Sequence, residues 1–318
     1  MNRPLQDWLE FAGLSAVAVI VRNLAFEQLR PIADTIGSIA YWLDRRGRAT
    51  ALANLEAAFP EKFSRSRKHW IARGSYRTFA RTMLELFWAP NITEEFVDQQ
   101  IVFSGLEHDP CHGDTPCATI YCCIHYGNFE WLSLVIAYSI TRMPVIAQKF
   151  RNPHLGPLFD SLRSSTGNQI IPQERAMLKM LKHLKAGGKF GLLIDLNIDP
   201  REGGVPLNTF DGLIASVTPA HVALAQRTGA SIVPVECLPL PDGRYNIVHH
   251  PPIECPSDAT LTTLAQKCWD SLEPGIKAHP ECWLWPYKHW RYKPRSGADR
   301  YPPYANHNNR FDSLIAPD

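Results

Sequence analysis

The stretch "CATIYCCIHYGNFEW" at residues 117–131 passes from a short apolar run into a turn and then into a helical pattern. The run at 117–124 has the length and apolar character of a buried strand. Gly127 permits a tight turn, after which residues 128–140 are predicted to form a helix. His125 is therefore expected at the C-terminal end of a strand, with Glu130 in the first turn of the following helix.

The same alternation of apolar runs and helical segments continues downstream. It predicts an α/β fold, in which a mostly parallel sheet is flanked by helices, over residues 96–295. Functional sites of such sheets lie at the C-terminal ends of the strands. The further predicted strands are 143–148, 189–196 and 231–240, and the helices between them lie at about 154–166 and 175–185.

Residues 1–95 are predicted to form a helical N-terminal region with membrane-associating segments. The apolar runs Phe11–Val21 and Ile36–Leu43 are both shorter than the ~20 residues of a membrane-spanning helix. They are expected to lie on a membrane or to pack on the core, with a true span as the alternative. Residues 296–318 are predicted to be an irregular tail.

A basic amphipathic helix is predicted at residues 63–84. It is either an ordinary core helix with a solvated charged face, or a surface for anionic lipid or an acidic carrier protein. The whole chain has 33 basic and 31 acidic residues, so its overall charge predicts no nucleic-acid partner. The basic residues of this helix are Arg65, Arg67, Lys68, Arg73, Arg77 and Arg81.

The eight cysteines include no CxxC pair, which favours reduced thiols in a cytosolic compartment. Cys122 and Cys123 are expected to be buried strand residues. The loop at 107–117 contains His108, Cys111, His112 and Cys117, but their spacing fits no common zinc pattern. This loop is therefore predicted to be a surface loop, and neither a metal nor another cofactor is expected.

The spacing of His125 and Glu130 allows two interpretations. A carboxylate beside a strand-end imidazole could fix its tautomer, as a general base requires. Alternatively, His125 is structural and Glu130 only interacts favourably with the helix dipole. The chain has no GxSxG, Walker A, GxGxxG or HExxH motif, which argues against serine hydrolases, nucleotide-binding proteins and zinc proteases.

Six blocks of sequence, in order, resemble the bacterial lipid A biosynthesis late (lauroyl/myristoyl-type) acyltransferase family. This family lies within the lysophospholipid acyltransferase-like superfamily, and the resemblance covers about residues 50–295. The blocks are "HYGNFE" at 125–130, "FRNP" at 150–153, "FDSLRSSTG" at 159–167, "GLLIDLNID" at 191–199, "FDGLIASVTPAHVALAQRTGASIVPV" at 210–235 and "HPECWLWPYKHWRYKP" at 279–294.

The resemblance implies a glycerolipid acyltransferase-like catalytic domain that transfers an acyl chain from acyl carrier protein to a hydroxyl of a lipid A precursor or related glycolipid. It makes His125 the general base and Glu130 its orienting partner. It implies a location at the cytoplasmic face of the bacterial inner membrane, held peripherally or by a single N-terminal anchor. The substrate-binding or oxyanion-stabilising residues that it implies are Arg163, with backbone amides of the turn after His125, and Arg151, Asp195 and Asn128.

Arg163, Arg151 and Asp195 each have a structural alternative, as a surface cation, a loop cation and a buried ion pair. The acceptor stays open, because Asn197 and Asp211 stand where many family members have an acid and an aromatic residue. A phosphatidylinositol mannoside, a lysophospholipid or an aminolipid would use the same pair. A thioesterase and a non-catalytic lipid-binding protein are further alternatives.

Overall fold

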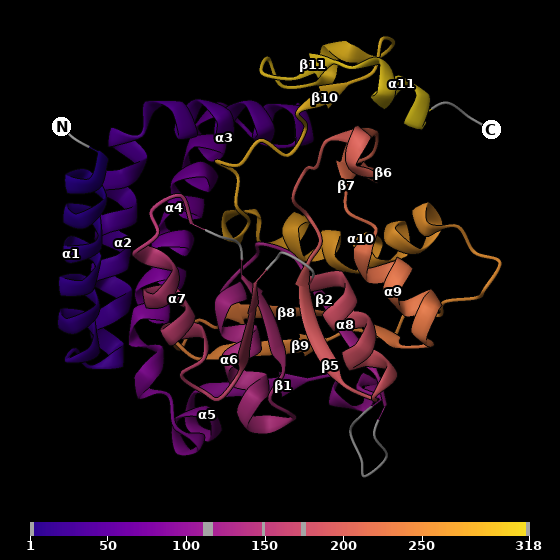
Figure 1. Ribbon diagram of the computed structural model, residues 1–318. Coiled ribbons are helices and arrows are strands. Elements are labelled where there is room, and N and C mark those ends of the chain that lie inside the picture. The colour runs from indigo at the N-terminus through magenta and orange to yellow at the C-terminus, as the bar shows by residue number, and fades with distance from the viewer. Residues whose placement is uncertain (1–2, 111–116, 148–149, 173–175, 316–318) are drawn as a thin grey trace.

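The computed structural model describes residues 3–110, 117–147, 150–172 and 176–315, and these residues form a five-stranded central sheet in the order β1-β9-β8-β2-β5 (Figure 1). β8 and β9 pair antiparallel, whereas the other neighbouring strands pair parallel. The predicted α/β class with a mostly parallel sheet is confirmed. The strands are β1 (Ile101–Ser104), β2 (Thr119–Cys123), β5 (Lys189–Leu193), β8 (Ser231–Pro239) and β9 (Tyr245–His249).

Smaller two-stranded units accompany the central sheet. One is the parallel pair β3–β4, another the antiparallel hairpin β6–β7, and a third the short parallel pair β10–β11. Seven of the described strands were not predicted from the sequence, namely β1, β4, β6, β7, β9, β10 and β11. The strands of these units are β3 (Pro144–Ala147), β4 (Gln169–Pro172), β6 (Val205–Thr209), β7 (Leu213–Val217), β10 (Tyr292–Lys293) and β11 (Asn306–His307).

Helices cover both faces of the central sheet. Ile120 and Cys122 of β2 pack in one apolar cluster with α8, α9 and α10, whereas Tyr121 and Cys123 pack in a second cluster with α6 and α7. Both cysteines are buried strand residues, as predicted. These helices are α6 (Phe129–Ser139), α7 (Leu155–Arg163), α8 (Ala176–Lys185), α9 (Ala220–Thr228) and α10 (Leu261–Ala278).

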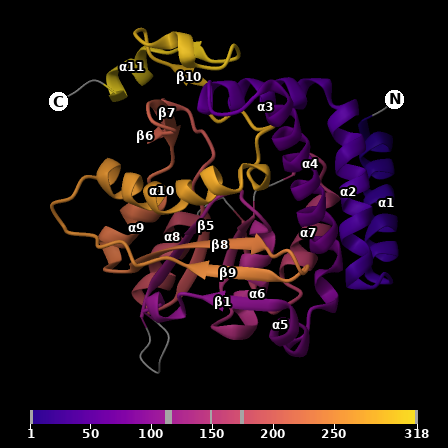
Figure 2. The same cartoon turned by 180° about the vertical axis from the view of Figure 1, so that it is seen from behind.

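The N-terminal region is helical, and α1, α2 and α4 lie side by side at one edge of the molecule (Figure 2). α2 approaches α4 closely at Gly37, where a Cβ would lie 2.5 Å from the Cα of Arg77. Only a residue without a side chain allows this approach. The helices are α1 (Arg3–Arg22), α2 (Phe26–Leu43), α3 (Arg45–Ala58), α4 (Arg65–Trp88) and α5 (Glu94–Gln100).

Helix α1 is 20 residues long, which is longer than the apolar run that it contains. Among the described residues, one segment, Pro4–Arg22, is long and apolar enough to cross a membrane, and 11% of it is buried. The expectation that the apolar segment is shorter than a membrane span is therefore wrong for α1, by length and composition. Leu5, Trp8 and Leu9 extend the apolar character toward the N-terminus, and all three are exposed.

The basic residues of α4 have partners within the protein at several positions. Arg77 and Arg81 both pair with Asp34 of α2, and Lys68 Nζ lies 2.6 Å from Glu56 Oε2. These pairs hold α4 against α2 and α3. The predicted continuous basic face is thus interrupted. Arg67 stacks over the exposed ring of Trp70 at 3.9 Å.

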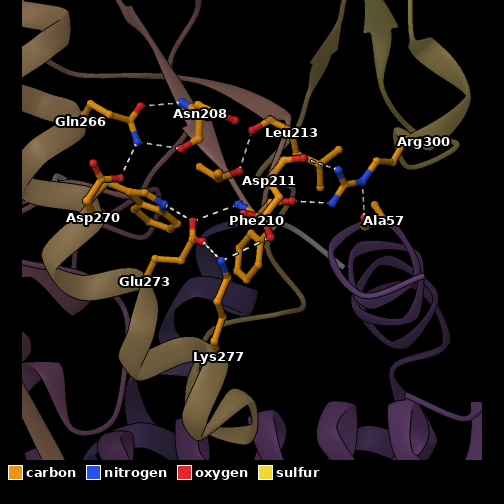
Figure 3. A network of polar contacts seen from close by, with 12 residues as sticks. Ala57, Asn208, Phe210, Asp211, Leu213, Gln266, Asp270, Glu273, Lys277 and Arg300 are labelled. Atoms are coloured by element: carbon orange, nitrogen blue, oxygen red, sulfur yellow. Dashed lines mark hydrogen bonds and ion pairs between the residues drawn. The ribbon is translucent and has the colours of Figure 1, made fainter. Parts of the chain in front are cut away.

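The described part of the C-terminal segment is structured, so the predicted irregular tail is wrong there. It contains η5 (Ala298–Arg300), β11 and α11 (Asn309–Ile315). Arg300 Nε donates to the carbonyl of Ala57 at 3.0 Å, and Nη1 donates to the carbonyl of Asp211 at 2.6 Å (Figure 3). This guanidinium fastens the segment to α3 and to the β6–β7 turn, and such long-range anchoring leaves no periodic signal in the sequence.

The β6–β7 turn itself is held from below by α10. Phe210 and Asp211 have positive φ values of 45° and 59°. The backbone N–H of Phe210 donates to Glu273 Oε2 at 2.9 Å, and Lys277 Nζ lies 2.5 Å from Glu273 Oε1 (Figure 3). Asp211, one of the two positions that depart from the family pattern, is an exposed turn residue.

Candidate active site

The turn between β2 and α6 places His125 directly beyond the end of β2. Gly127 has a φ of 58°, and a Cβ at this position would lie 1.9 Å from the carbonyl oxygen of Cys237. A residue with a side chain would therefore displace the turn. Asn128 is the N-cap of α6, because its side chain accepts a hydrogen bond from the Trp131 N–H at 3.2 Å.

Backbone hydrogen bonds of this turn are made within the protein. The N–H groups of Tyr126, Gly127 and Asn128 donate to the carbonyls of Ile124, Cys282 and Cys237 at 2.7, 3.0 and 2.9 Å respectively. These amides are consequently occupied. The expectation that amides of this turn stabilise an oxyanion is not supported for these three residues.

The imidazole of His125 is held by Asp195, which follows the end of β5. His125 Nδ1 lies 2.7 Å from Asp195 Oδ1, and the backbone N–H of His125 donates to Asp195 Oδ2 at 3.1 Å. Trp283 Nε1 donates to the same Oδ2 at 3.0 Å. The Asp195 side chain is fully buried. Because Nδ1 is engaged, Nε2 is the ring nitrogen left to face a substrate.

The Asp195 carboxyl is ionised at neutral pH. Burial alone would raise its pKa, but the neighbouring imidazole of His125 and the hydrogen bonds that the carboxylate accepts lower its pKa to about 2. His289 stacks on Trp283 with ring centroids 3.8 Å apart, and burial lowers the pKa of this histidine to about 4. His289 is thus neutral and provides no counter-charge for Asp195. The Asp195 carboxylate makes its hydrogen bond to a histidine ring with His125.

Glu130 is bound by Arg163 instead of by His125. Arg163, the last residue of α7, donates from Nε to Oε2 at 2.9 Å and from Nη2 to Oε1 at 2.6 Å. This is a two-pronged pair of the strong, charge-assisted kind. The orienting contact predicted for Glu130 is therefore made by Asp195, because the first turn of α6 directs the Glu130 side chain toward α7.

One pocket of about 450 Å³ is lined by His125, Glu130 and Arg163, whereas Asp195 contacts His125 and does not line it. His125, Glu130 and Arg163 contribute its charged and titratable groups. The rest of the lining is largely apolar and comes from β2, β3, β5 and α6. Its apolar side chains include Tyr121, Cys123, Phe129, Leu132, Ile136, Met143, Val145, Ile146, Phe150, Leu193, Leu196 and Val235.

Two of the predicted site residues lie away from this pocket. Arg151 is exposed and lines a different pocket, beside Asp7 and Glu10 of α1. Asn128 is buried, and its amide contacts Glu85 and the start of α6. The structure therefore does not bring Arg151 to His125, and it gives the side chain of Asn128 a local structural contact. Asn128 and Arg151 both lie in sequence blocks that resemble the family, at 125–130 and 150–153. Membership of a block therefore did not show which residues line the pocket.

The tryptophans of the block at 279–294 are core residues. Trp283, Trp285 and Trp290 are each at most 2% exposed and pack against Phe210. They do not line the 450 Å³ pocket. Trp283 nevertheless supports the site indirectly, since its indole N–H donates to Asp195.

Glu85 of α4 is a buried residue that the sequence reasoning missed. Its Oε2 accepts hydrogen bonds from the Asn128 side chain and from the Tyr245 hydroxyl, the latter at 2.7 Å. Thr82, one turn earlier, donates to the carbonyl of Gly127 at 3.1 Å. The N-terminal helical region thus holds the turn between His125 and Glu130. The one available signal was a lone acid in the apolar segment at 83–88.

Glu85 gives a testable pH dependence of stability. Burial raises its pKa to about 7, against the lowering effect of its two hydrogen bonds. A raised pKa means that the contribution to stability is present below the ordinary value near 4.5 and is lost as pH rises through about 7. We expect Glu85→Gln to remove this loss, worth up to roughly 3 kcal/mol, since the amide oxygen can accept both hydrogen bonds.

The measurement is thermal unfolding of the full chain between about pH 4 and 8, a range that includes both the ordinary pKa near 4.5 and the raised pKa of about 7. Glu107→Gln, at an exposed carboxylate, is the matched control and should follow the wild type. If the unfolding temperature changes with pH by the same slope in wild type and in Glu85→Gln, Glu85 is not the group that titrates.

The cysteine and metal expectations have mixed outcomes. Six cysteines are free thiols, but Cys117 is disulfide-bonded, so the prediction of reduced thiols is wrong at that position. Of the loop residues considered for a metal, Cys111 and His112 lie outside the described residues. Within the described part of the chain, no three His, Cys, Asp or Glu side chains are grouped so as to hold a metal ion.

Comparison with known proteins identifies the family. Residues 2–292 match the sequence model of the bacterial lipid A biosynthesis acyltransferases. The chain is 24% identical to the lipid A biosynthesis lauroyltransferase of Escherichia coli strain K12 over 303 residues, which cover 92% of this chain and 95% of that protein. It is 21% identical to lipid A biosynthesis acyltransferase 2 of Shigella flexneri over 278 residues, 86% of each chain. The resemblance of the six sequence blocks is confirmed, and the chain belongs to the bacterial lipid A biosynthesis acyltransferase family.

Proposed function

We propose that this acyltransferase moves a fatty acyl chain from the thioester of acyl carrier protein to a hydroxyl of a lipid A precursor or related glycolipid. One observation carries the proposal: His125, held by Asp195, lines an otherwise largely apolar pocket. A general base is needed to deprotonate a hydroxyl, and an apolar pocket suits a fatty chain. Family membership supports the lipid A precursor as acceptor.

His125 acts as the general base in this proposal. Asp195 accepts a hydrogen bond from the Nδ1–H group and so fixes the tautomer in which Nε2 is unprotonated. Nε2 takes the proton of the acceptor hydroxyl while its oxygen attacks the thioester carbonyl carbon. The carbon–sulfur bond then breaks, and the imidazolium returns the proton to the departing thiolate. The ionised Asp195 stabilises the imidazolium between these two steps.

Arg163 is proposed to stabilise the oxyanion of the tetrahedral intermediate. Glu130 engages its Nε and Nη2 atoms, and Nη1 is not used by that pair. Glu130 holds the guanidinium in position and raises its pKa, although burial alone would lower it. A fixed cation beside the reacting carbonyl stabilises the charge that develops in the transition state. Glu130 is thus a positioning residue that acts through Arg163.

We propose attachment to the cytoplasmic face of the bacterial inner membrane by a single N-terminal anchor, α1. An exposed apolar stripe on α2 is evidence that this part of the protein also contacts the membrane. Burial of such side chains in lipid is favourable, and this stripe recurs at helical spacing. Its residues are Ile32, Ile36, Ile39, Trp42 and Leu43.

Gly13→Arg tests the anchor, because it places a charge near the middle of α1. Among the described residues, no heavy atom lies within 4 Å of a Cβ at Gly13, so the fold accepts the side chain. A central arginine costs ~3 kcal/mol in a membrane helix. We expect wild type to stay in the membrane pellet after carbonate extraction, and Gly13→Arg to be released in larger part.

Gly156→Arg is the matched control, since Gly156 is equally open but lies on α7. It should remain in the pellet. Release of the wild type itself by carbonate would replace the anchor with peripheral attachment.

The activity is tested with the full chain in detergent, supplied with labelled acyl carrier protein and a panel of lipid hydroxyl acceptors. The proposal expects an acylated lipid A precursor. Acylation of a different lipid alone would reassign the acceptor. Free fatty acid without acylated lipid would show a thioesterase, and binding without turnover would show a non-catalytic protein.

A further inference from the structure

The 450 Å³ pocket runs along β2 and β5, away from His125. Alternate residues of a strand point to the same face, so residues two apart line the same side of the pocket. The paired strands therefore present successive rows of side chains at this wall. In order from His125, which lies beyond the end of β2, the rows are Cys123 with Leu193 and then Tyr121 with Gly191.

The row farthest from His125 contains a glycine that the backbone does not require. Gly191 lies within β5, without the positive φ that favours glycine. The nearest neighbours of a Cβ built there are Met143 Sδ and the Tyr121 carbonyl oxygen, both at the ordinary contact distance of 3.9 Å. A side chain would fit locally, and it would occupy the end of the pocket. Because Gly191 has no side chain, that end of the pocket stays open.

Helix α6 closes the other side of the same space. It runs back from Glu130, beside the reacting end, through Ser133 to Ile136, and all three residues line the pocket. Met143, which precedes β3, is 3% exposed and lines it as well. The pocket is thus bounded along its length by β2 and β5 on one side and by α6 on the other.

The length of this wall can be compared with the length of an extended acyl chain. The four steps along the chain from Tyr121 to His125 span at most ~13 Å at ~3.3 Å per strand residue. An extended hydrocarbon advances ~1.3 Å per carbon, given carbon–carbon bonds of ~1.5 Å. A straight acyl chain whose carbonyl lies at His125 would reach the Tyr121–Gly191 row after about ten carbons.

We propose that Gly191 determines the length of acyl chain that this enzyme accepts. The chain lies along β2 and β5 with its terminal methyl group directed toward Gly191 and Met143. This inference rests on the proposed acyl transfer from a thioester donor. Gly191 would set the selectivity for donor chain length, which neither the His125–Asp195 pair nor the acceptor determines.

The test is a graded series, Gly191→Ala, Gly191→Val and Gly191→Leu, assayed as the full chain. For donors of about eight to sixteen carbons, one methylene that a hydrophobic pocket cannot accommodate costs roughly 10- to 200-fold in kcat/KM. We expect the longest accepted donor to shorten stepwise with side-chain size. The ratio of kcat/KM for the shortest donor to kcat/KM for the longest donor should rise at each step of the series.

Met143→Ala is the opposite change and should extend the range toward longer donors, because it removes volume beside Gly191. It keeps the proposal testable if Gly191→Leu fails to fold. Gly156→Leu, at an open glycine outside the pocket, is the control and should leave the donor profile unchanged.

Different results would contradict the proposed acyl transfer and the proposed role of Gly191. If wild type transfers no acyl group from any donor, the proposed function fails. If wild type transfers acyl groups but the Gly191 series and Met143→Ala keep the wild-type length profile, the assignment of chain length to Gly191 is overturned and the proposed function stands.

Discussion

His125→Ala should lower the rate of acyl transfer by a factor on the order of 10² to 10⁴, the range that general acid–base catalysis contributes. Without Nε2, no group of the pair can take the proton of the acceptor hydroxyl. The side chain is largely buried but lies at the pocket wall, so its truncation leaves the apolar lining in place. The rate is measured at saturating donor and acceptor, with thermal unfolding as a check on folding.

Two comparisons sharpen this experiment. His307→Ala, at an exposed histidine of β11, should retain wild-type activity. The KM for the acyl donor should change little in His125→Ala, because the base contributes to the transition state more than to donor binding. A His125→Ala variant with transfer within a few-fold of wild type would remove His125 from the mechanism.

Asp195→Asn should produce the second large loss, again on the order of 10² to 10⁴. Asparagine is nearly the same size, but it has no charge to stabilise the imidazolium, and its amide can favour the wrong tautomer of His125. The buried carboxylate also accepts hydrogen bonds from the His125 and Trp283 N–H groups, so some loss of stability is expected. The kcat and the unfolding temperature are measured together to separate the two effects.

Asp199→Asn is the matched control for this substitution. Asp199 lies four residues further on, and its carboxylate binds Arg201 at the surface instead of His125. It should retain near wild-type kcat. If Asp195→Asn is as active as Asp199→Asn, then Asp195 is only a structural partner, and the orientation of His125 must come from elsewhere.

The sequence predicted the place of the residues that we propose as the catalytic pair better than their pairing. His125 and Asp195 each follow an apolar run, and the C-terminal ends of neighbouring parallel strands lie at one edge of a sheet. Their convergence was therefore predictable. The carboxylate that contacts the imidazole was not, because the direction of the Glu130 side chain depends on Arg163, which comes from another helix.

The parts of the fold that were missed share a physical reason. Strands β1 and β4 have four residues each, and β4 ends in a proline, so neither gives a clear periodic pattern. The support that Glu85 gives to the turn after His125 depends on the packing of α4 against α6. Long-range contacts such as these determine stability without marking the local sequence.

The most direct test of the central claim is mass spectrometry of the lipid after incubation with acyl carrier protein charged with a fatty acid. With wild type, the lipid A precursor should gain the mass of one fatty acid less one water. With His125→Ala, this product should be nearly absent under the same conditions. Unmodified lipid with free fatty acid in the wild-type reaction, or equal product from the variant, would contradict the account.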